Sequence, residues 1–343
     1  MSSTLVARMD NEGDVLLAGP AIRAVAATSS VALLCGRRGR AAAALLPGVR
    51  EVIEWTAPWI DPDPAPVDLV ETLSLVSMLR NRFSQAIILT SFHQSPLPLA
   101  LLMRLAGIER VAAISDDYPG SLLDVRHRAD DRLHEVERSL DLVGRCGYRL
   151  PPGDDGRLRV LRGARGPRIP QQPYLVVHPG ASMPARTLDA QHWREVVRAL
   201  TGAGHTVVVT GSPGERLLTA EVARAGKPRT RDLAGHTSLS ELAEVIAGAA
   251  AVVVGNTGPA HLAAAVGTPV VSLFAPTVPA RKWRPWMVPH VVLGDQQIAC
   301  AGCRAQVCPV PGHPCISSIR PAAVVDAVQE LMGEAPPMMA EAG

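Results

Sequence analysis

The fold is decided by residues 252–276, VVVGNTGPAHLAAAVGTPVVSLFAP. Its apolar runs, residues 252–254 and 270–274, have the length and β-branched content of buried strands. Between them, Pro259 suits the first turn of a helix, and Gly267 suits the left-handed position that closes one. The stretch therefore predicts a strand, a turn, a short helix and a second strand of a parallel sheet.

The turn at residues 255–258 has the features of an anion site. Backbone N–H groups and the positive end of a helix dipole would point away from the carboxyl end of the strand. Asn256, Thr257 and His261 add polar side chains at this edge, where open α/β sheets bind ligands. Alternatively, the turn only caps its helix, and His261 is a capping or core residue.

Length and composition indicate a globular two-domain protein. The chain has 343 residues, 47% of them hydrophobic and 19% charged. Its net charge of +2 argues against a nucleic-acid-binding protein, so we expect no nucleic acid partner. With no apolar run of membrane-spanning length and no signal-peptide pattern, we expect no transmembrane segment. We expect a cytoplasmic protein, with peripheral attachment to the inner membrane face as an alternative.

The first domain is expected over residues 1–165. It begins with a strand (4–8), an acidic loop and a helix (15–27) that Pro20 would kink. Asp14 would lie at the start of this helix, where it could either cap the helix or act as a general base. Further strands are expected at residues 30–35, 49–55, 86–90 and 111–114, and helices at 39–46, 69–82, 98–106 and 130–143.

Residues 151–173, rich in Pro, Gly and Arg, are the expected domain boundary. A second domain over residues 170–325 repeats the alternation, and residues 333–343 are expected to form a flexible tail. Its further strands are expected at 174–178 and 206–210, and its helices at 189–200, 217–225 and 239–247. The fold class is thus α/β, with two Rossmann-like βα domains and a ligand cleft expected between them.

Several nucleotide-binding and metal motifs are absent or weak. No Gly-x-Gly-x-x-Gly follows a strand and no Gly-x-x-x-x-Gly-Lys-Ser/Thr occurs, which disfavours NAD binding and P-loop chemistry. Asp61 and Asp63 form an Asp-x-Asp pair, but prolines surround it, so a solvated loop is expected there.

Four cysteines lie close together in residues 300–315, CAGCRAQVCPVPGHPC. The spacing C-x2-C-x4-C-x6-C fits a structural metal site of four thiolates, with Zn or Fe as the ion. Reduced cysteines that pack a small loop are the alternative. The candidate ligands are Cys300, Cys303, Cys308 and Cys315.

Taken in order, the motifs resemble the glycosyltransferase family 9, the heptosyltransferase-like enzymes of the GT-B class. The resemblance runs from Arg8 to about Pro321. It rests on Arg8-x-Asp10-x-x-Gly13-Asp14 with Pro20, on residues 178–182 (HPGAS) with Trp193, on residues 255–261 followed by LFAP, and on the late cysteine run.

The resemblance implies an inverting transfer of a sugar, typically heptose from ADP-heptose, to an acceptor hydroxyl without a catalytic metal or other cofactor. Asp14 would be the general base. The donor-binding residues would be Gly13, Ser182, Arg186, Thr187, Gly211, Glu215, Asn256, Thr257, Gly258 and His261. In some relatives a four-cysteine cluster binds iron and supports oligomers, so a homo-oligomer is also implied.

Two positions depart from the family pattern. Arg186 stands where the phosphate loop usually carries lysine, and a guanidinium can bind a diphosphate by its forked geometry. Asn256 replaces the usual aspartate, which removes a negative charge and adds donors, and so bears on the identity of the donor sugar.

The acceptor is left open as a glycan, a lipid-linked sugar or a small molecule. Two other functions compete with transfer: a catalytically silent, metal-bridged assembly protein on the same fold, and a nucleotide-sugar epimerase.

Overall fold

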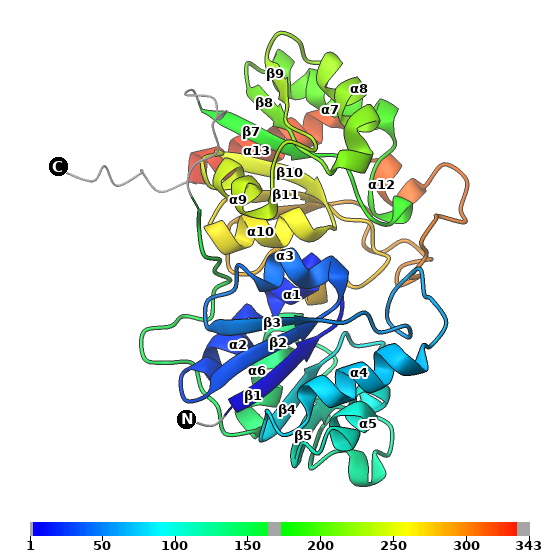
Figure 1. Ribbon diagram of the computed structural model, residues 1–343. Helices are drawn as coiled ribbons and strands as arrows, with labels where there is room; N and C mark the ends of the chain where they lie inside the picture. Colours follow the sequence, from blue (N-terminus) through cyan, green and yellow to red (C-terminus); the bar gives the residue numbers. More distant parts are fainter. Residues whose placement is uncertain (1–2, 164–172, 335–343) are drawn as a thin grey trace, which may run out of the picture. The chain divides into compact units, whose positions relative to one another are not determined.

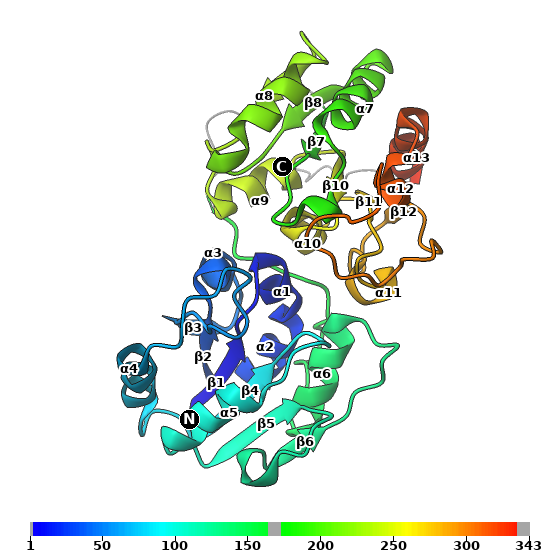
Figure 2. The same ribbon diagram turned by 90° about the vertical axis from the view of Figure 1, so that its right-hand side faces the viewer.

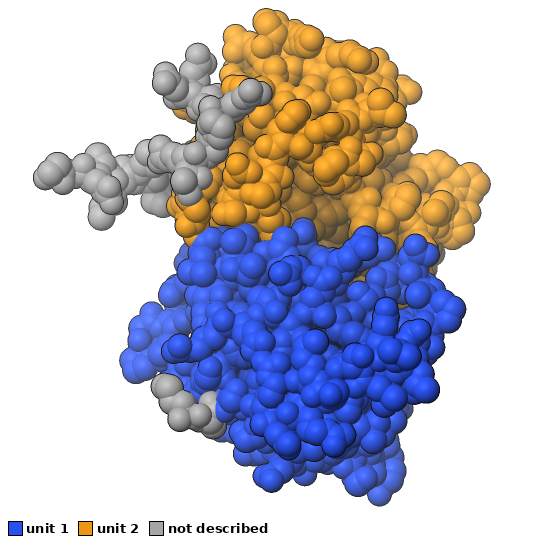
Figure 3. Space-filling view, viewed as in Figure 1, with its two compact units in different colours: residues 1–161 blue, residues 162–343 orange. Residues whose placement is uncertain are grey.

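The computed structural model describes residues 3–163 and 173–334. The chain divides into two compact units, residues 1–161 and 162–343 (Figures 1 and 3). Within the described residues, each unit contains one six-stranded sheet whose paired strands all run parallel. This confirms the predicted α/β class with two Rossmann-like domains.

Unit 1 has the strand order β3-β2-β1-β4-β5-β6. Its strands are β1 (Ser3–Arg8), β2 (Ser30–Cys35), β3 (Val49–Glu54), β4 (Gln85–Leu89), β5 (Arg110–Ile114) and β6 (Val125–His127). Its helices are α1 (Glu12–Leu17), α2 (Gly19–Ala26), α3 (Arg40–Ala43), α4 (Leu69–Leu79), α5 (Leu97–Leu105) and α6 (Glu135–Arg145), with 3-10 turns at Arg37–Gly39 and Gly120–Leu122.

Unit 2 has the strand order β12-β11-β10-β7-β8-β9. Its strands are β7 (Tyr174–His178), β8 (Thr206–Val209), β9 (Thr230–Asp232), β10 (Ala251–Gly255), β11 (Val270–Leu273) and β12 (His290–Leu293). Its helices are α7 (Ala190–Gly202), α8 (Arg216–Arg224), α9 (Leu239–Ala247), α10 (Gly258–Val266), α11 (Ala280–Trp283), α12 (Pro314–Ser317) and α13 (Pro321–Glu334), with 3-10 turns at Pro184–Arg186 and Pro213–Glu215.

Helices cover both faces of each sheet, as Figure 2 shows for β1 and its neighbours. The inner strands of each sheet are buried on both faces, which explains why they read as continuous apolar runs. In unit 1, alternate residues of β1, β2, β4 and β5 form one apolar core with α4 and α5. In unit 2, alternate residues of β7, β8, β10 and β11 form the corresponding core with α7, α8 and α13.

The deciding stretch folds as its sequence predicts. β10, α10 and β11 follow one another, and β10 pairs with both β11 and β7. Pro259 lies in the first turn of α10, and Gly267 ends the helix with φ of +81°. A left-handed backbone at this position costs glycine little, which is why the helix ends there.

The predicted helix over residues 15–27 is wrong in two respects. It begins at Glu12, and it divides at Ala18 into α1 and α2. Pro20 lies in the first turn of α2, where its missing N–H is harmless, so it starts a helix instead of kinking one. Asn11, and not Asp14, occupies the N-cap position of α1.

Other boundaries also differ from expectation. The helix predicted from residue 130 begins at Glu135, because His134 caps it in a capping box with Glu137. α13 was not predicted, and it includes residues 333–334 of the expected tail. The rest of that tail, residues 335–343, lies outside the described residues. In the described part of the chain, no helix is long and apolar enough to cross a membrane.

A buried ion pair joins the end of unit 1 to α2. Arg23 donates from Nε and Nη2 to the Asp154 carboxylate at 2.6 and 2.9 Å, and from Nη2 to the Arg157 carbonyl at 2.8 Å. The Arg23 and Asp154 side chains are only 8% and 6% exposed. These hydrogen bonds lower the pKa of Asp154 to about 2.

We expect Arg23→Ala to lower the free energy of unfolding of unit 1 by about 3 kcal/mol, because it leaves the Asp154 carboxylate buried without its partner. Arg82→Ala breaks the exposed pair with Glu51 and is the matched control, with an expected loss below about 1 kcal/mol. Urea unfolding followed by circular dichroism measures both variants.

The pH dependence has a definite sign. Folding lowers the pKa of Asp154 from 3.8 to about 2. The ionised carboxylate therefore adds its full contribution to the free energy of unfolding above about pH 4, and this contribution disappears as the pH falls toward 2. The difference in free energy of unfolding between wild type and Arg23→Ala should therefore shrink over this pH range. An equal difference at pH 7 and at pH 2.5 would contradict the assignment.

Candidate active site

In unit 1 the candidate site lies at the point where the chain direction across the sheet reverses. β2 and β3 extend the sheet on one side of β1, and β4 to β6 extend it on the other. The loops that follow β1 and β4 therefore leave a crevice at the carboxyl edge, the usual place for a ligand in such sheets. Arg8, the last residue of β1, points its side chain into this region.

Arg8 is the centre of a buried charge cluster. Its Nε lies 2.9 Å from Asp10 Oδ2, and its Nη2 donates to Asp14 Oδ1 at 3.1 Å. The same Nη2 donates to Ser91 Oγ at 2.9 Å and lies 3.5 Å from Glu135 Oε2. The guanidinium, which is 1% exposed, thus binds two carboxylates that closely follow β1 and a third, Glu135, from α6.

The burial of these charges shifts their pKa values. Burial raises the pKa of Asp10 to about 6; the charges of Asp14 and Glu135 act in the same direction, and Arg8 and Gln94 oppose them. Burial alone would lower the pKa of Arg8, but the three carboxylates outweigh it and raise that pKa. Arg8 therefore stays charged.

Asp14 is the third residue of α1 and the predicted general base. Its side chain is 18% exposed, the highest value among the three carboxylates that Arg8 contacts. Arg8 fixes one carboxylate oxygen, Oδ1. A carboxylate that is oriented by a cation and still reaches solvent has the geometry a general base needs. Gly13, the preceding residue, is buried in α1.

Four contributors to this cluster were not predicted. Ser91 and Gln94 follow β4, and Gln94 Nε2 donates a hydrogen bond to Asp10 Oδ1. Glu135 and Arg138 lie on α6, with Arg138 Nη1 3.5 Å from Glu135 Oε1. In the sequence, these residues could have been noticed as two charged residues near the start of a helix. In the structure both are buried. Ser91, Gln94 and Glu135 lie more than 80 positions from the residues that they contact at the end of β1, so local pattern could not identify them.

The candidate donor site in unit 2 lies at the equivalent reversal, between β7 and β10. The loop after β7 holds Arg186, and the turn after β10 begins at Gly255. A Cβ added at Gly255 would lie 2.5 Å from the Arg186 carbonyl oxygen. The two loops are therefore in backbone contact, and only glycine fits between them.

Two buried polar atoms of the turn after β10 have no hydrogen-bond partner among the described residues. They are Asn256 Nδ2 and Thr257 Oγ1. Both precede α10, whose positive dipole end lies at this turn. Buried polar groups without partners are uncommon and often mark a ligand site. Gly258 starts α10, and His261 is buried one turn later.

The loop after β7 is held by Thr187. Its Oγ1 donates to the Pro179 carbonyl at 2.6 Å and accepts from Trp193 Nε1 at 2.9 Å. Trp193 is fully buried in the unit 2 core, so the loop is anchored to that core. Ser182 is exposed on the same loop, and Arg186 ends its 3-10 turn.

Gly211 and Glu215 lie after β8, next to β7 in the sheet. Ser212 caps the turn with Glu215, whose Oε2 accepts from the Ser212 N–H at 2.7 Å. A Cβ on Gly180 would lie 2.0 Å from Glu215 Oε1, so the Glu215 side chain lies against the loop after β7. The structure thus brings the predicted donor residues of three loops to one edge of the unit 2 sheet.

The cysteine run does not form the predicted metal site in this structure. All four thiols line one recess together with His313, but Cys303 is exposed whereas Cys315 is buried in the core. Burial raises the pKa of Cys315 to about 11, and the other three thiols add to the shift. Within residues 3–163 and 173–334, no group of three or more His, Cys, Asp or Glu is arranged to hold a metal ion.

The backbone of the cysteine run supports the donor-site loops. The Ala185 N–H donates to the Gln306 carbonyl at 2.9 Å, next to Arg186. The Gly302 and Arg304 N–H groups donate to the carbonyls of Pro276 and Thr277 at 2.7 and 3.0 Å, just after β11. The run therefore holds the loop after β7 and the end of β11 in place.

Solved structures similar to this chain share its fold. The heptosyltransferase II of Escherichia coli, described as an ADP-heptose lps heptosyltransferase, superposes with a TM-score of 0.72 at 20% identity and covers 97% of this chain and 98% of its own. The iron-containing dodecameric glycosyltransferase TibC from enterotoxigenic E. coli gives a TM-score of 0.56 at 15% identity, over 96% of this chain and 76% of its own. These matches confirm the GT-B fold.

Sequence comparison also finds heptosyltransferases. The lipopolysaccharide heptosyltransferase 1 of Pseudomonas aeruginosa is 36% identical over 150 residues, which cover 43% of this chain and 41% of that protein. The chain spans about half or less of the length of the curated relatives that it matches. The family model described as glycosyltransferase family 9 (heptosyltransferase) matches residues 73–313, well over half of the chain. The chain therefore belongs to glycosyltransferase family 9.

Proposed function

We propose that this protein is an inverting, metal-independent glycosyltransferase that moves heptose from ADP-heptose to an acceptor hydroxyl. The observation that carries the proposal is the Asp14 carboxylate, oriented by Arg8 at the reversal point of the unit 1 sheet. Family membership and the unpartnered polar atoms of Asn256 and Thr257 in unit 2 support it.

In the proposed reaction, Asp14 accepts the proton of the acceptor hydroxyl while that oxygen attacks the anomeric carbon. The bond between this carbon and the donor phosphate oxygen breaks, and its electron pair leaves with the nucleoside diphosphate. Attack opposite to the leaving group inverts the anomeric configuration. Arg8, which stays protonated, holds the Asp14 carboxylate in one orientation during this step.

The departing diphosphate would be stabilised in unit 2. The dipole at the start of α10 would attract an anion, and the Arg186 guanidinium can add a forked contact. Such preorganised donors stabilise charge that develops in the transition state, so the step needs no metal ion. Asn256 would bind donor hydroxyls through its amide, as both a donor and an acceptor.

Calorimetry of the purified protein with ADP-heptose, ADP, UDP-glucose and GDP-mannose tests the donor. Selective binding of ADP-heptose supports the proposal, whereas preference for another nucleotide sugar would keep the transferase and change its donor. Binding of none of them would contradict it.

We expect Asp14→Asn to lower kcat roughly 100- to 10,000-fold while the dissociation constant for ADP-heptose stays within about twofold, because the amide keeps the shape but cannot accept the proton. The control is Glu12→Gln, which changes another acid in the same helical turn and should retain wild-type turnover. Loss of donor binding in a folded Asp14→Asn variant would contradict the role of a base.

We expect Gly255→Ala to weaken ADP-heptose binding at least about tenfold, because the new Cβ would lie 2.5 Å from the Arg186 carbonyl and displace the loop. Gly202→Ala is the control, since nothing lies within 4 Å of a Cβ at that position. Calorimetry on both variants makes the comparison. Equal donor affinity in both would show that contact between the two loops is irrelevant to donor binding.

A second proposal concerns the cysteine run, which we infer binds a structural Zn or Fe ion when its four thiols rearrange around their shared recess. The shared recess and the iron-containing TibC dodecamer support it. In this proposal the ion serves assembly of a homo-oligomer, because four thiolates leave no open coordination position for catalysis.

We expect elemental analysis of the aerobically and anaerobically purified protein to give about one metal ion per chain. Cys300→Ser combined with Cys303→Ser should lose the ion and lower the mass measured by light scattering. The control is Cys146→Ser, which lies in unit 1 and should change neither. Less than a tenth of an equivalent of metal in the wild type would contradict this proposal.

A further inference from the structure

An apolar surface of unit 1 is left uncovered on α4 and α5. The two helices pack against each other and lie side by side in Figure 1. Their inner residues belong to the unit 1 core, so their outer residues point away from the sheet. Around this outer side, seven large apolar side chains are between 47% and 73% exposed. We name them together the α4–α5 face: Val67, Leu69, Val70, Leu73, Met78, Leu101 and Leu105.

The size of the α4–α5 face sets it apart from ordinary surface. Single exposed apolar residues are common on proteins and need no partner. The largest apolar patch on a typical monomer covers roughly 300–600 Å² and is often functional. Seven side chains of this size on adjoining helices, each exposed over about half of its surface or more, reach the top of that range. We therefore expect the face to be covered by a partner.

The outer side of α4 (Leu69–Leu79) has the shape of a helix-packing surface. Val70, Ser74 and Ser77 follow one another at helical spacing along it, with Leu73 and Met78 to either side. Both serines are exposed. Because the distance between packed helices depends on the side chains at the contact, the small serines let a second helix approach closely.

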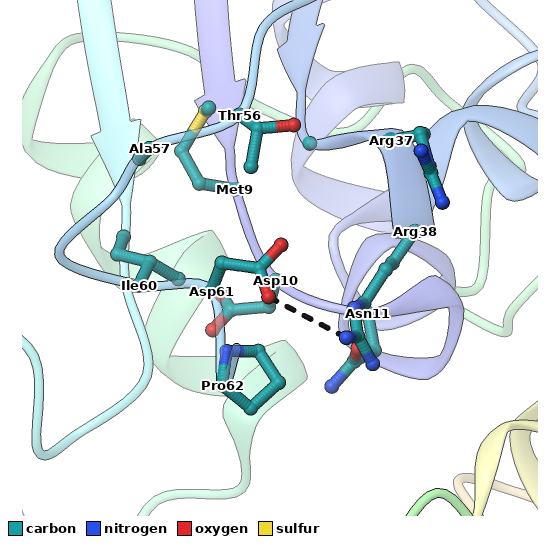
Figure 4. A pocket seen from close by; sticks show the side chains of 11 residues that line it. Met9, Asp10, Asn11, Arg37, Arg38, Thr56, Ala57, Ile60, Asp61 and Pro62 are labelled. Atoms are coloured by element: carbon teal, nitrogen blue, oxygen red, sulfur yellow. Dashed lines mark ion pairs between the residues drawn. The ribbon is translucent and has the colours of Figure 1, made fainter. Parts of the chain in front are cut away.

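The α4–α5 face is held in place before any partner arrives. In the segment that leads to α4, Arg38 Nη2 lies 3.4 Å from Asp61 Oδ1, the ion pair that Figure 4 marks. The Asp61 N–H donates to the Ala57 carbonyl at 3.1 Å. Asp68 then caps α4, since its Oδ1 accepts from the Glu71 N–H at 2.8 Å. A surface that is already ordered loses little conformational entropy on association.

The charges along α4 have opposite signs at its two ends. Asp68 and Glu71 lie at its start, and Arg80 and Arg82 follow its end. Arg82 is paired with Glu51 of its own chain, whereas the Glu71 and Arg80 side chains form no ion pair with any described residue. A helix that is acidic at one end and basic at the other is complementary to a second copy of itself that runs in the opposite direction.

This charge order also bears on the alternative partner, a lipid surface. Anionic lipids attract clusters of Lys and Arg. The start of α4 instead presents the exposed carboxylates of Asp63, Asp68 and Glu71 beside its apolar residues. A second copy of the chain offers these carboxylates a cation, and an anionic membrane offers them repulsion.

We propose that the α4–α5 face is the interface of a homodimer in which α4 of one copy packs antiparallel to α4 of the other. The twofold axis passes near Ser74, in the middle of α4, so that Val70 of each copy faces Met78 of the other. The acidic start of each α4 then lies beside the basic end of the other copy. The four helices of the two copies form one packed layer with an apolar centre and a charged rim.

This interface is separate from the metal-bridged assembly proposed for the cysteine run, because it uses only residues of unit 1. Sedimentation velocity on the full-length protein tests it, over a roughly hundredfold range of concentration that includes the micromolar region. Wild type and Cys300→Ser combined with Cys303→Ser are compared. We expect the cysteine variant, which lacks the proposed metal contacts, to have twice the mass of one chain and to dissociate on dilution.

The apolar contact is tested in that same cysteine variant. Val70→Glu should weaken dimerisation at least about tenfold, because it buries a carboxylate against the apolar side of the other copy. The control is Leu217→Glu, which makes the same kind of change at a side chain that is 89% exposed on α8 in unit 2. It should dimerise within about twofold of its parent. Thermal unfolding shows whether each variant is folded.

The antiparallel arrangement is tested by reversing the charges. Glu71→Arg alone and Arg80→Glu alone should each weaken dimerisation by about three- to tenfold, because each change places like charges together at two points of a twofold interface. The two changes combined restore the attraction and should return the dissociation constant to within about twofold of the parent.

Three results would overturn the inference: the mass of a single chain at every concentration, equal dimerisation with and without Val70→Glu, or no recovery when the two charge reversals are combined. Flotation with vesicles of phosphatidylethanolamine and phosphatidylglycerol tests the lipid surface. A wild type that floats, a Val70→Glu variant that does not, and a single-chain mass in solution would assign the face to a membrane and reject the dimer. None of these results bears on the proposed transfer reaction, because the face contains no residue of the candidate site.

Discussion

At the end of β1, one buried guanidinium lies among three carboxylates, and these desolvated charges are tolerated only because each faces an opposite charge. Arg8 can contact Asp10, Asp14 and Glu135 together because guanidinium presents several donors in a fixed plane. The loop after β1, the first helix and α6 all meet at this side chain. The position of the Asp14 carboxylate therefore depends on it.

The two units use the same sheet reversal for opposite electrostatic purposes. In unit 1 the reversal point carries carboxylates arranged around one guanidinium, and a carboxylate can accept a proton. In unit 2 it carries glycine, neutral polar side chains and the positive dipole end of α10. A base and an anion site need these different environments, and one parallel topology provides both because its strands end at a common edge.

The sequence allowed the fold class and most strands to be predicted, because buried parallel strands read as short apolar runs between turn residues. Pro259 and Gly267 also marked α10 correctly. Pro20 was misread, since a proline alone does not say whether it interrupts one helix or starts another.

The contacts of Arg8 with Ser91 and Glu135 could not be predicted, because they depend on strand order and not on local spacing. The cysteine spacing predicted a ligand set that the described geometry does not form, since Cys315 is held in the core and Cys303 at the surface.

The hydrogen bond between the Ala185 N–H and the Gln306 carbonyl has a consequence for the chemistry of the protein's thiols. The loop after β7 has little regular structure of its own, so its backbone is held partly by this hydrogen bond to the cysteine run. Oxidation or alkylation of those thiols would change the path of the run and weaken this hydrogen bond. The loop that carries Arg186 would then respond to the redox state of its surroundings, although no cysteine needs to touch the donor.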